Sequence, residues 1–199
     1  GGIMASHVAL TSWPGPESFP SVRAHVELME VSKLQRLLLR AHEAAVAVRQ
    51  AEQLAATWKE DVAEDGSVLR AGTSATGHTV GIMVLASGAR FAGHLRNGKM
   101  HGAGGLQWPA GKGGAVVVVG EGEREKAVMV VAYLGEFRDG FFDGEGRLWL
   151  SGGHEFCGEF RNGVRQGWGC EWCRASDEPT VGSFFDGRYV SGLHMASIC

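Results

Sequence analysis

The hydrophobic and polar residues of this chain follow two different patterns, which change near Asp65-Gly66. Before that point, apolar residues recur at alternating three- and four-residue steps, and eight of ten such positions between residues 31 and 62 are apolar. This spacing is typical of an amphipathic or coiled-coil helix. Ser21 can cap the start of a helix and Gly66 can end it. The pattern therefore predicts one long helix over residues 21–65, after an irregular segment at residues 1–20.

The apolar stripe of this helix packs either on the rest of the same chain or on a partner helix. At 1.5 Å per residue, a helix from Ser21 to Glu64 is about 65 Å long. About eight strands at 4.8 Å make a sheet only about 40 Å wide. Part of the stripe would then extend beyond such a sheet and need another surface. The candidate partner-binding residues on this segment are Leu34, Leu38, Val48 and Trp58.

After the change, short runs alternate aromatic or aliphatic residues with polar residues or glycine, and 28 of the 31 glycines lie here. Three segments align with one another and begin at Phe91, Tyr133 and Phe156. A partial copy precedes them at residues 81–88, and another follows at residues 182–187. The sequence thus contains an internal repeat.

Asx-Gly dipeptides stand at matched positions in four of these copies. They are Asn97-Gly98, Asp139-Gly140, Asn162-Gly163 and Asp186-Gly187. Two-residue hairpin turns need positive φ, which these residues tolerate, so each dipeptide predicts a β-hairpin. Because an isolated hairpin is only marginally stable in water, successive hairpins must stack into one extended antiparallel sheet. The predicted fold is mainly β, with a sheet domain over residues 66–199.

The repeat resembles the MORN repeat over about residues 81–192. The shared pattern is aromatic-x-Gly-x-aromatic-x-Asn-Gly-x-x-x-Gly-x-Gly-x-Leu-x-aromatic, and Glu171 stands in the third copy where Leu106 and Leu148 stand in the first two. The resemblance implies an elongated antiparallel sheet that serves protein contact, self-association or, in some accounts, lipid binding. An intracellular location follows as an expectation, in a cytoskeletal or ciliary assembly or at the periphery of an organelle membrane.

The first two full copies begin 42 residues apart and the next two 23 residues apart, which leaves an insertion of 19 residues. Two apolar, valine-rich runs in the insertion, residues 115–119 and 127–131, flank a polar tip and predict an additional hairpin within residues 112–132. This hairpin is either a lengthened turn or a docking finger for a partner.

Composition narrows the classes of function. The chain has 19 basic and 22 acidic residues, a net charge of −3, which provides no general attraction to nucleic acid. No apolar run reaches the length of a transmembrane span. The four cysteines all lie in the last 43 residues without a disulfide framework, which favours a reducing compartment. The expected partners are therefore proteins, with self-association as an alternative.

The four residues His154, Cys157, Cys170 and Cys173 form the sharpest candidate for chemistry, because their spacing suits tetrahedral zinc. In a regular strand, however, Cys170 and Cys173 point to opposite faces. Small, buried packing cysteines are the alternative. No nucleophile with a suitable base and acid is evident, and the glycines belong to hairpins rather than to a phosphate-binding loop. We therefore expect no catalytic residues and no cofactor.

No acidic residue occurs between Asp65 and Glu121, so the first repeats are locally basic. The candidate residues for contact with an anionic lipid or an acidic protein are Arg90, Arg96, Lys99 and Lys112. A simple solvated face is the alternative. On the sheet, Trp108, Trp149 and Trp172 would line or flank a partly open face and are candidate partner-binding residues.

Three hypotheses follow from the sequence. The first is a non-catalytic scaffold or accessory subunit that holds partner proteins in a larger assembly. The second is a peripheral membrane module that binds anionic lipid through its basic face. The third is a small zinc-binding protein.

Overall fold

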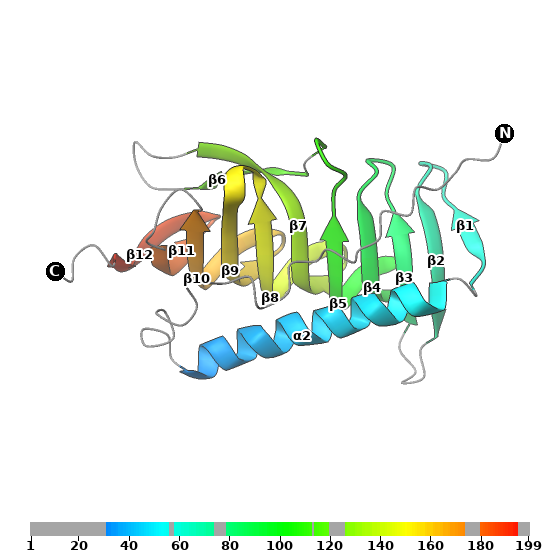
Figure 1. Ribbon diagram of the computed structural model, residues 1–199, viewed down its shortest axis with the longest axis horizontal. Helices are drawn as coiled ribbons and strands as arrows, with labels where there is room; N and C mark the ends of the chain where they lie inside the picture. The colour runs from blue at the N-terminus through cyan, green and yellow to red at the C-terminus, as the bar shows by residue number, and fades with distance from the viewer. Residues whose placement is uncertain are drawn as a thin grey trace. The chain divides into compact units, whose positions relative to one another are not determined.

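A computed structural model describes residues 31–55, 58–73, 79–112, 114–119, 126–173 and 180–194. The chain divides into two compact units, Gly1–Gln35 and Arg36–Cys199. The second unit contains the β-sheet and the helix from Arg36 onward (Figure 1). The predicted irregular segment at residues 1–20 and the predicted helix start at Ser21 lie outside the described residues.

The strands that the structure describes form one antiparallel sheet that follows the order of the chain except at β6 (Figure 1). Its path is β1-β2-β3-β4-β5-β7-β8-β9-β10-β11-β12, and β6 pairs only with β7. The strands are β1 (Glu60–Val62), β2 (Val68–Thr73), β3 (Thr79–Val84), β4 (Arg90–Arg96), β5 (Lys99–Gln107), β6 (Val116–Val119), β7 (Lys126–Arg138), β8 (Phe141–Leu150), β9 (His154–Arg161), β10 (Val164–Cys173), β11 (Thr180–Phe185) and β12 (Arg188–His194). The predicted fold class, an antiparallel sheet of hairpins preceded by one helix, is confirmed.

A continuous row of glycines crosses this sheet. Each glycine faces the next across neighbouring strands, in the order Gly81, Gly93, Gly104, Gly135, Gly146, Gly158, Gly169, Gly182 and Gly192. The first aromatic residue of each full repeat lies two positions before a glycine of the row and is fully buried. A Cβ added at Gly104 would lie 2.7 Å from Cε2 of Phe91. The glycines therefore leave the space that the aromatic rings occupy.

These rings form the main hydrophobic core on the same face of the sheet as the glycine row. They meet edge to face, with centroid separations of 5.1 Å for Phe91–Phe137, 5.1 Å for Tyr133–Phe160 and 4.8 Å for Phe156–Phe184. Such geometry brings the positive edge of one ring to the negative face of the next. The buried Tyr133 hydroxyl donates a hydrogen bond of 3.0 Å to the Glu136 carbonyl oxygen. The repeat thus builds a continuous core mainly from two positions per repeat, the first aromatic residue and the apolar residue four positions later.

The insertion between the first two full repeats forms a hairpin from β6 and the beginning of β7. Val116 pairs with Met129 and Val119 with Lys126. Its inward side chains Val119, Val128 and Val130 belong to the aromatic core. The insertion therefore contributes to the core that the repeats build.

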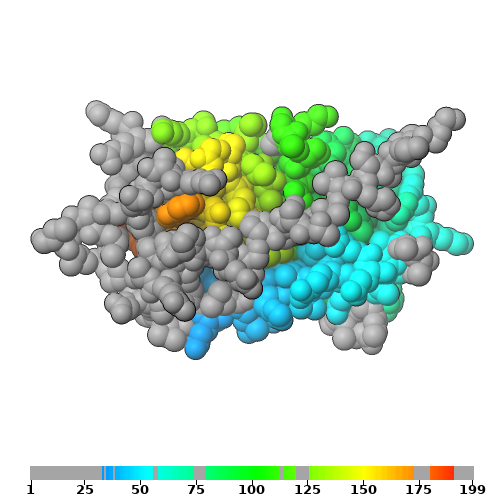
Figure 2. Space-filling view, in the orientation of Figure 1, coloured from blue at the N-terminus to red at the C-terminus, as the bar shows by residue number. Residues whose placement is uncertain are grey.

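The helix α2 (Val31–Leu54) lies on the opposite face of the sheet. Three ion pairs join it to strands β4, β7 and β8: Arg90–Glu52 at 3.1 Å, Arg40–Glu136 at 3.6 Å and Arg36–Glu145 at 3.2 Å. Its buried side chains are small, Ala44, Ala47, Val48 and Ala51. In Figure 2 the cyan C-terminal half of the helix adjoins the strands of the first repeats. The small side chains let the helix approach the sheet closely.

The predicted end of the helix is wrong. The helix ends at Leu54, and Glu60–Val62 form strand β1 where the sequence pattern predicted further helix. The 24 described residues of the helix span about 36 Å. The eleven strands on the path of the sheet give a width of about 48 Å, because β1, β2 and β12 extend it beyond the eight strands expected. The described part of the helix is therefore shorter than the sheet is wide.

Candidate interaction surfaces

The hairpin turns of the repeats lie along one edge of the sheet. In all four dipeptides both residues have positive φ, for example 52° at Asn97 and 72° at Gly98, as the sequence predicted. The last three turns are also bonded to the preceding repeat, because Gly140, Gly163 and Gly187 donate their N–H groups to the carbonyl oxygens of Met100, Phe142 and Arg165 at 2.8–3.0 Å. The turn edge is therefore a rigid, regularly spaced surface.

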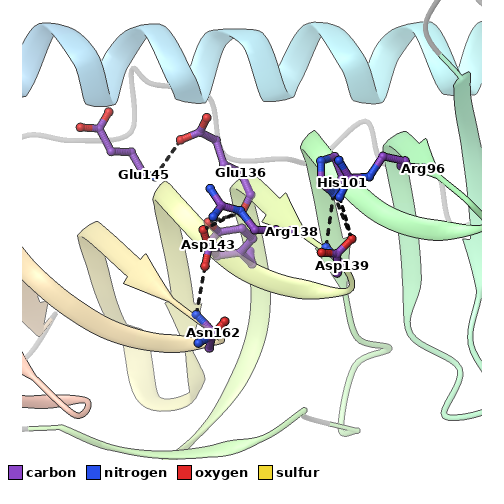
Figure 3. Close-up of polar contacts among 9 residues, drawn as sticks. Arg96, His101, Glu136, Arg138, Asp139, Asp143, Glu145 and Asn162 are labelled. Carbon is purple, nitrogen blue, oxygen red and sulfur yellow. Dashed lines mark hydrogen bonds and ion pairs between the residues drawn. The ribbon is translucent and has the colours of Figure 1, made fainter.

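A second set of hydrogen bonds runs through side chains along the same edge (Figure 3). His101 Nδ1, Asp143 Oδ2 and Gln166 Oε1 accept bonds of 3.3–3.4 Å from the N–H groups of Asp139, Asn162 and Asp186. The acceptors occupy matched positions in successive repeats. One side chain per repeat thus fixes the turn of the next repeat.

Exposed apolar and basic side chains pair with each other beside these turns. We define the turn-edge strip as the three cross-strand pairs Arg138–Phe141, Arg161–Val164 and Phe185–Arg188. Phe141 is 57% exposed, Val164 37% and Phe185 65%. A Cβ added at Gly163 would lie 3.6 Å from Phe141, and one at Gly187 would lie 3.3 Å from Val164, so each pair adjoins the next turn. Sequence reasoning missed this strip, although its signal is the residue on either side of each Asx-Gly dipeptide.

Charges are segregated on the face that carries the strip. Side chains alternate along a strand, so the strip shares its face with Glu136, Glu145 and α2. Towards the helix, Arg36 and Arg40 pair with these glutamates, and burial raises the pKa of Glu145 although Arg36 opposes the shift. Towards the turns, Arg138 pairs with Asp143 at 3.2 Å, whereas Arg161 has no ion-pair partner among the residues that the structure describes. The row beside α2 is thus acidic and neutralised by the helix, while the outer row is basic.

The four predicted anion-contact residues do not gather into one patch. Arg90 and Arg96 stand at opposite ends of β4, about 20 Å apart. Arg90 pairs with Glu52 of α2, and Arg96 pairs with Asp139 at 3.0 Å; this hydrogen bond lowers the pKa of Asp139. Lys99 is exposed beside the first turn, and Lys112 is exposed beyond the other end of β5. The basic face expected from the sequence is therefore divided between two edges of the sheet.

The predicted partner-binding residues are mostly buried or half-buried. Val48 is part of the buried helix face, and Trp149 is only 9% exposed, with Arg147 over its ring at 4.5 Å. Trp108 packs against the aromatic core, Trp58 lies over Gly72, and Trp172 is half-buried. Leu34 and Leu38 lie in α2, but their side chains are outside the described residues. Large apolar residues reach solvent beside the turns and on the insertion hairpin, and singly at Leu39 on α2, Val62 in β1, Val84 in β3 and Val190 in β12.

The outer face of the insertion hairpin carries the second group of exposed apolar residues. Val116 is 64% exposed, Met129 42% and Val131 38%. The edge of β6 is partly engaged, because Arg165 donates a hydrogen bond to the Val118 carbonyl oxygen. A partner would therefore contact the exposed side chains of this hairpin more readily than the backbone at the edge of β6.

The proposed zinc residues form two cross-strand pairs. Cys157 lies opposite Cys170, and His154 lies opposite Cys173. Burial raises the pKa of Cys157 to about 11 and that of Cys170 to about 12. In the part of the chain that the structure describes, no group of three or more His, Cys, Asp or Glu side chains is placed to hold a metal ion. This geometry is that of half-buried, protonated thiols.

The departure of the third repeat at Glu171 has a structural explanation. Strand β10 keeps its register, and Glu171 faces Phe156 as Leu148 does. Arg165, which is 3% exposed, forms an ion pair with Glu171 and donates hydrogen bonds to the Val118 and Gly187 carbonyl oxygens. Arg165 occupies the position of Phe142 in the preceding repeat. Two apolar positions have thus been replaced by one buried ion pair that also ties the insertion to the last hairpin.

This arrangement defines a β-hairpin repeat protein. A family comparison identifies the repeat: the MORN repeat matches residues 91–112, 133–155 and 156–177, the three full copies. The chain therefore contains three MORN repeats, a non-catalytic repeat module that generally serves protein or membrane interaction. The partial copies lie outside these matches, although β11 and β12 continue the sheet with the same kind of turn. No curated protein matches the chain. Among the described residues, no helix has both the length and the hydropathy of a membrane-spanning segment.

Proposed function

We propose that this protein is a non-catalytic scaffold or accessory subunit that binds protein partners through its repeat sheet. The observation that carries the proposal is the placement of exposed apolar side chains on rigid backbone, above all Phe141, Val164 and Phe185 beside the turns. Exposed apolar groups that recur on a fixed framework are typical of protein interfaces. Within the described ranges, no group of three or more His, Cys, Asp or Glu side chains is placed to hold a metal ion.

The membrane alternative has less support. Its basic residues stand at two edges of the sheet, and two of them are paired with acidic residues of the same chain. An anionic leaflet attracts clustered basic residues that are free to approach it. A protein partner is therefore favoured over a lipid surface.

Site-specific photocrosslinking in the full chain tests the proposal. A photoreactive phenylalanine replaces Phe185 at the turn edge or Val116 on the insertion hairpin, and the exposed Asp65 serves as a control position. We expect one of the two apolar positions to yield a discrete crosslinked protein in a cell extract, with no such product at Asp65. Equal labelling at all three positions, or no product at any of them, would contradict the proposal. Flotation on anionic vesicles without any crosslinked protein would favour the membrane alternative.

A further inference from the structure

The turn-edge strip combines three exposed apolar residues with three arginines in three cross-strand pairs, of which the third is reversed, so that Phe185 follows Val164. Successive repeats are two strands apart, so its pairs recur about every 9.6 Å. The four turn dipeptides, the residues immediately before and after each of them, and Asp143 together include five basic and three acidic residues. This local surplus of positive charge is opposite in sign to the net charge of −3 for the whole chain. A complementary partner surface is therefore acidic and apolar.

The backbone of the turns restricts the conformation of that partner. The N–H groups of Gly140, Gly163 and Gly187 are already bonded to the preceding repeat. Those of Asp139, Asn162 and Asp186 are bonded to side chains. An added β-strand depends on free backbone groups, whereas a helix satisfies its own backbone and needs only side-chain contacts. The strip therefore suits a helix better than an extended peptide.

The molecule's own helix illustrates the mode of recognition. α2 lies on the same face of the sheet and presents Arg36 and Arg40 to Glu145 and Glu136. The neighbouring row, towards the turns, has the opposite charge, with Arg138 68% exposed and Arg161 without an ion-pair partner among the described residues. Seven residues of helix advance about 10.5 Å, close to the spacing of the strip. A second helix with Asp or Glu at heptad spacing would match Arg138 and Arg161, which lie two strands apart, while Arg188 lies one strand further along than this spacing requires.

We infer that the turn-edge strip binds an acidic amphipathic helix of another protein. Its carboxylates would meet Arg138, Arg161 and Arg188, and its apolar side chains would cover Phe141, Val164 and Phe185. This inference rests on the proposed function and specifies both the surface and the chemistry of the partner.

A designed peptide tests the inference with the full chain. The probe is a fluorescein-labelled helix of about 21 residues, with Leu and Glu repeated at heptad spacing on one face. A reference peptide carries Lys in place of each Glu. We expect fluorescence anisotropy to show binding of the acidic peptide that weakens with added salt, and about tenfold weaker binding of the basic peptide.

Four variants locate the site. Arg161→Glu should weaken binding of the acidic peptide about tenfold, because it replaces an attraction with a repulsion. Phe185→Ser should weaken it about fivefold through lost apolar contact. Lys112→Glu makes the same charge change at an exposed residue outside the strip and should leave binding unchanged. Arg161→Glu should in turn improve binding of the basic peptide, a gain that misfolding cannot produce; Asp65→Ala serves as a neutral surface control.

Equal binding of the two peptides, no binding of either, or an unchanged affinity in Arg161→Glu would overturn the assignment of the strip. A photocrosslinked partner at Val116 together with any of these results would leave the scaffold proposal intact and reject only this surface. Failure of crosslinking at both Phe185 and Val116 would instead reject the scaffold proposal itself.

Discussion

The glycine row makes a direct prediction about stability, which Gly104→Ala tests. An added Cβ would lie 2.7 and 2.8 Å from Cε2 and Cζ of Phe91 and 3.0 Å from the carbonyl oxygen of Ala92. The Phe91 ring is fully buried and meets Phe137 edge to face at 5.1 Å, so it has little room to move. Overpacking of this kind costs about 1–3 kcal/mol.

We expect the Gly104→Ala variant to lose about 2–3 kcal/mol of unfolding free energy. For a chain of this length, that loss lowers the melting temperature by roughly 5–10 °C. Urea unfolding followed by circular dichroism measures it, with the slope of the transition checked for a change, because repeat proteins can lose cooperativity. Gly98→Asn is the matched control, since Gly98 has open space and a φ of 72° that asparagine tolerates.

A double-mutant cycle with Phe91→Leu identifies the cause of the loss. The smaller side chain removes the ring that the added methyl group meets, so the cost of Gly104→Ala should fall by about 1 kcal/mol or more in the Phe91→Leu background. Outside a clash, glycine to alanine at a permissive backbone position stabilises a protein by about 0.4–1 kcal/mol. A neutral or stabilising Gly104→Ala, or strictly additive effects, would refute the view that the glycines make room for the rings.

Three further predictions concern buried and turn residues. Arg165→Ala should destabilise the protein by about 3–5 kcal/mol because it removes the ion-pair partner of the buried Glu171, whereas Arg165→Phe with Glu171→Leu, which restores the residue types of the preceding repeat, should recover at least half of that loss in urea unfolding. In a Cys173→Ser, Cys199→Ser background, Cys157 and Cys170 should resist a thiol reagent at pH 8 and react once the protein is unfolded; rapid labelling of the native protein would contradict this. Burial raises the folded pKa values of these thiols to about 11 and 12 from 9.0. Their contribution to the free energy of unfolding is therefore complete below pH 9 and is lost as the pH rises through about 11 to 12. Arg96→Gln should raise the pKa of Asp139 towards its ordinary value in an NMR titration, since the Arg96 hydrogen bond holds it down, and an unchanged pKa would rule out that contact.

The parts of the fold governed by local chemistry could be predicted from the sequence. Asn97-Gly98 and its three counterparts fix positive φ within two residues, so the turns, the hairpins and their antiparallel stacking follow from the pattern. The end of the helix was less predictable, because the apolar spacing continues to Val62 whereas pairing with β2 draws Glu60–Val62 into the sheet. That pairing is a tertiary contact, which overrides local periodicity.

The surfaces were harder to predict than the fold. Tryptophan is a common interface residue, yet Trp149 is buried beside Arg147, and the exposed aromatic residues in the described part of the chain are Phe141 and Phe185. The exposure of these side chains depends on the face of the sheet to which they point and on what covers that face. Both become visible only when the repeats are stacked. The role of Glu171 likewise required its partner Arg165, six residues away along the same strand and opposite in charge.

The bonds from each turn to the repeat before it have a consequence for synthesis. Gly140, Gly163 and Gly187 each donate to a residue nearer the N-terminus, so a hairpin that leaves the ribosome finds its binding surface already made. Domains and repeats that fold in the order of synthesis avoid long waits with exposed apolar surface. The insertion hairpin is the exception, because its contact through Val118 requires Arg165, which emerges 47 residues later. Until then, the insertion hairpin lacks this contact, while its outer residues Val116 and Met129 remain exposed.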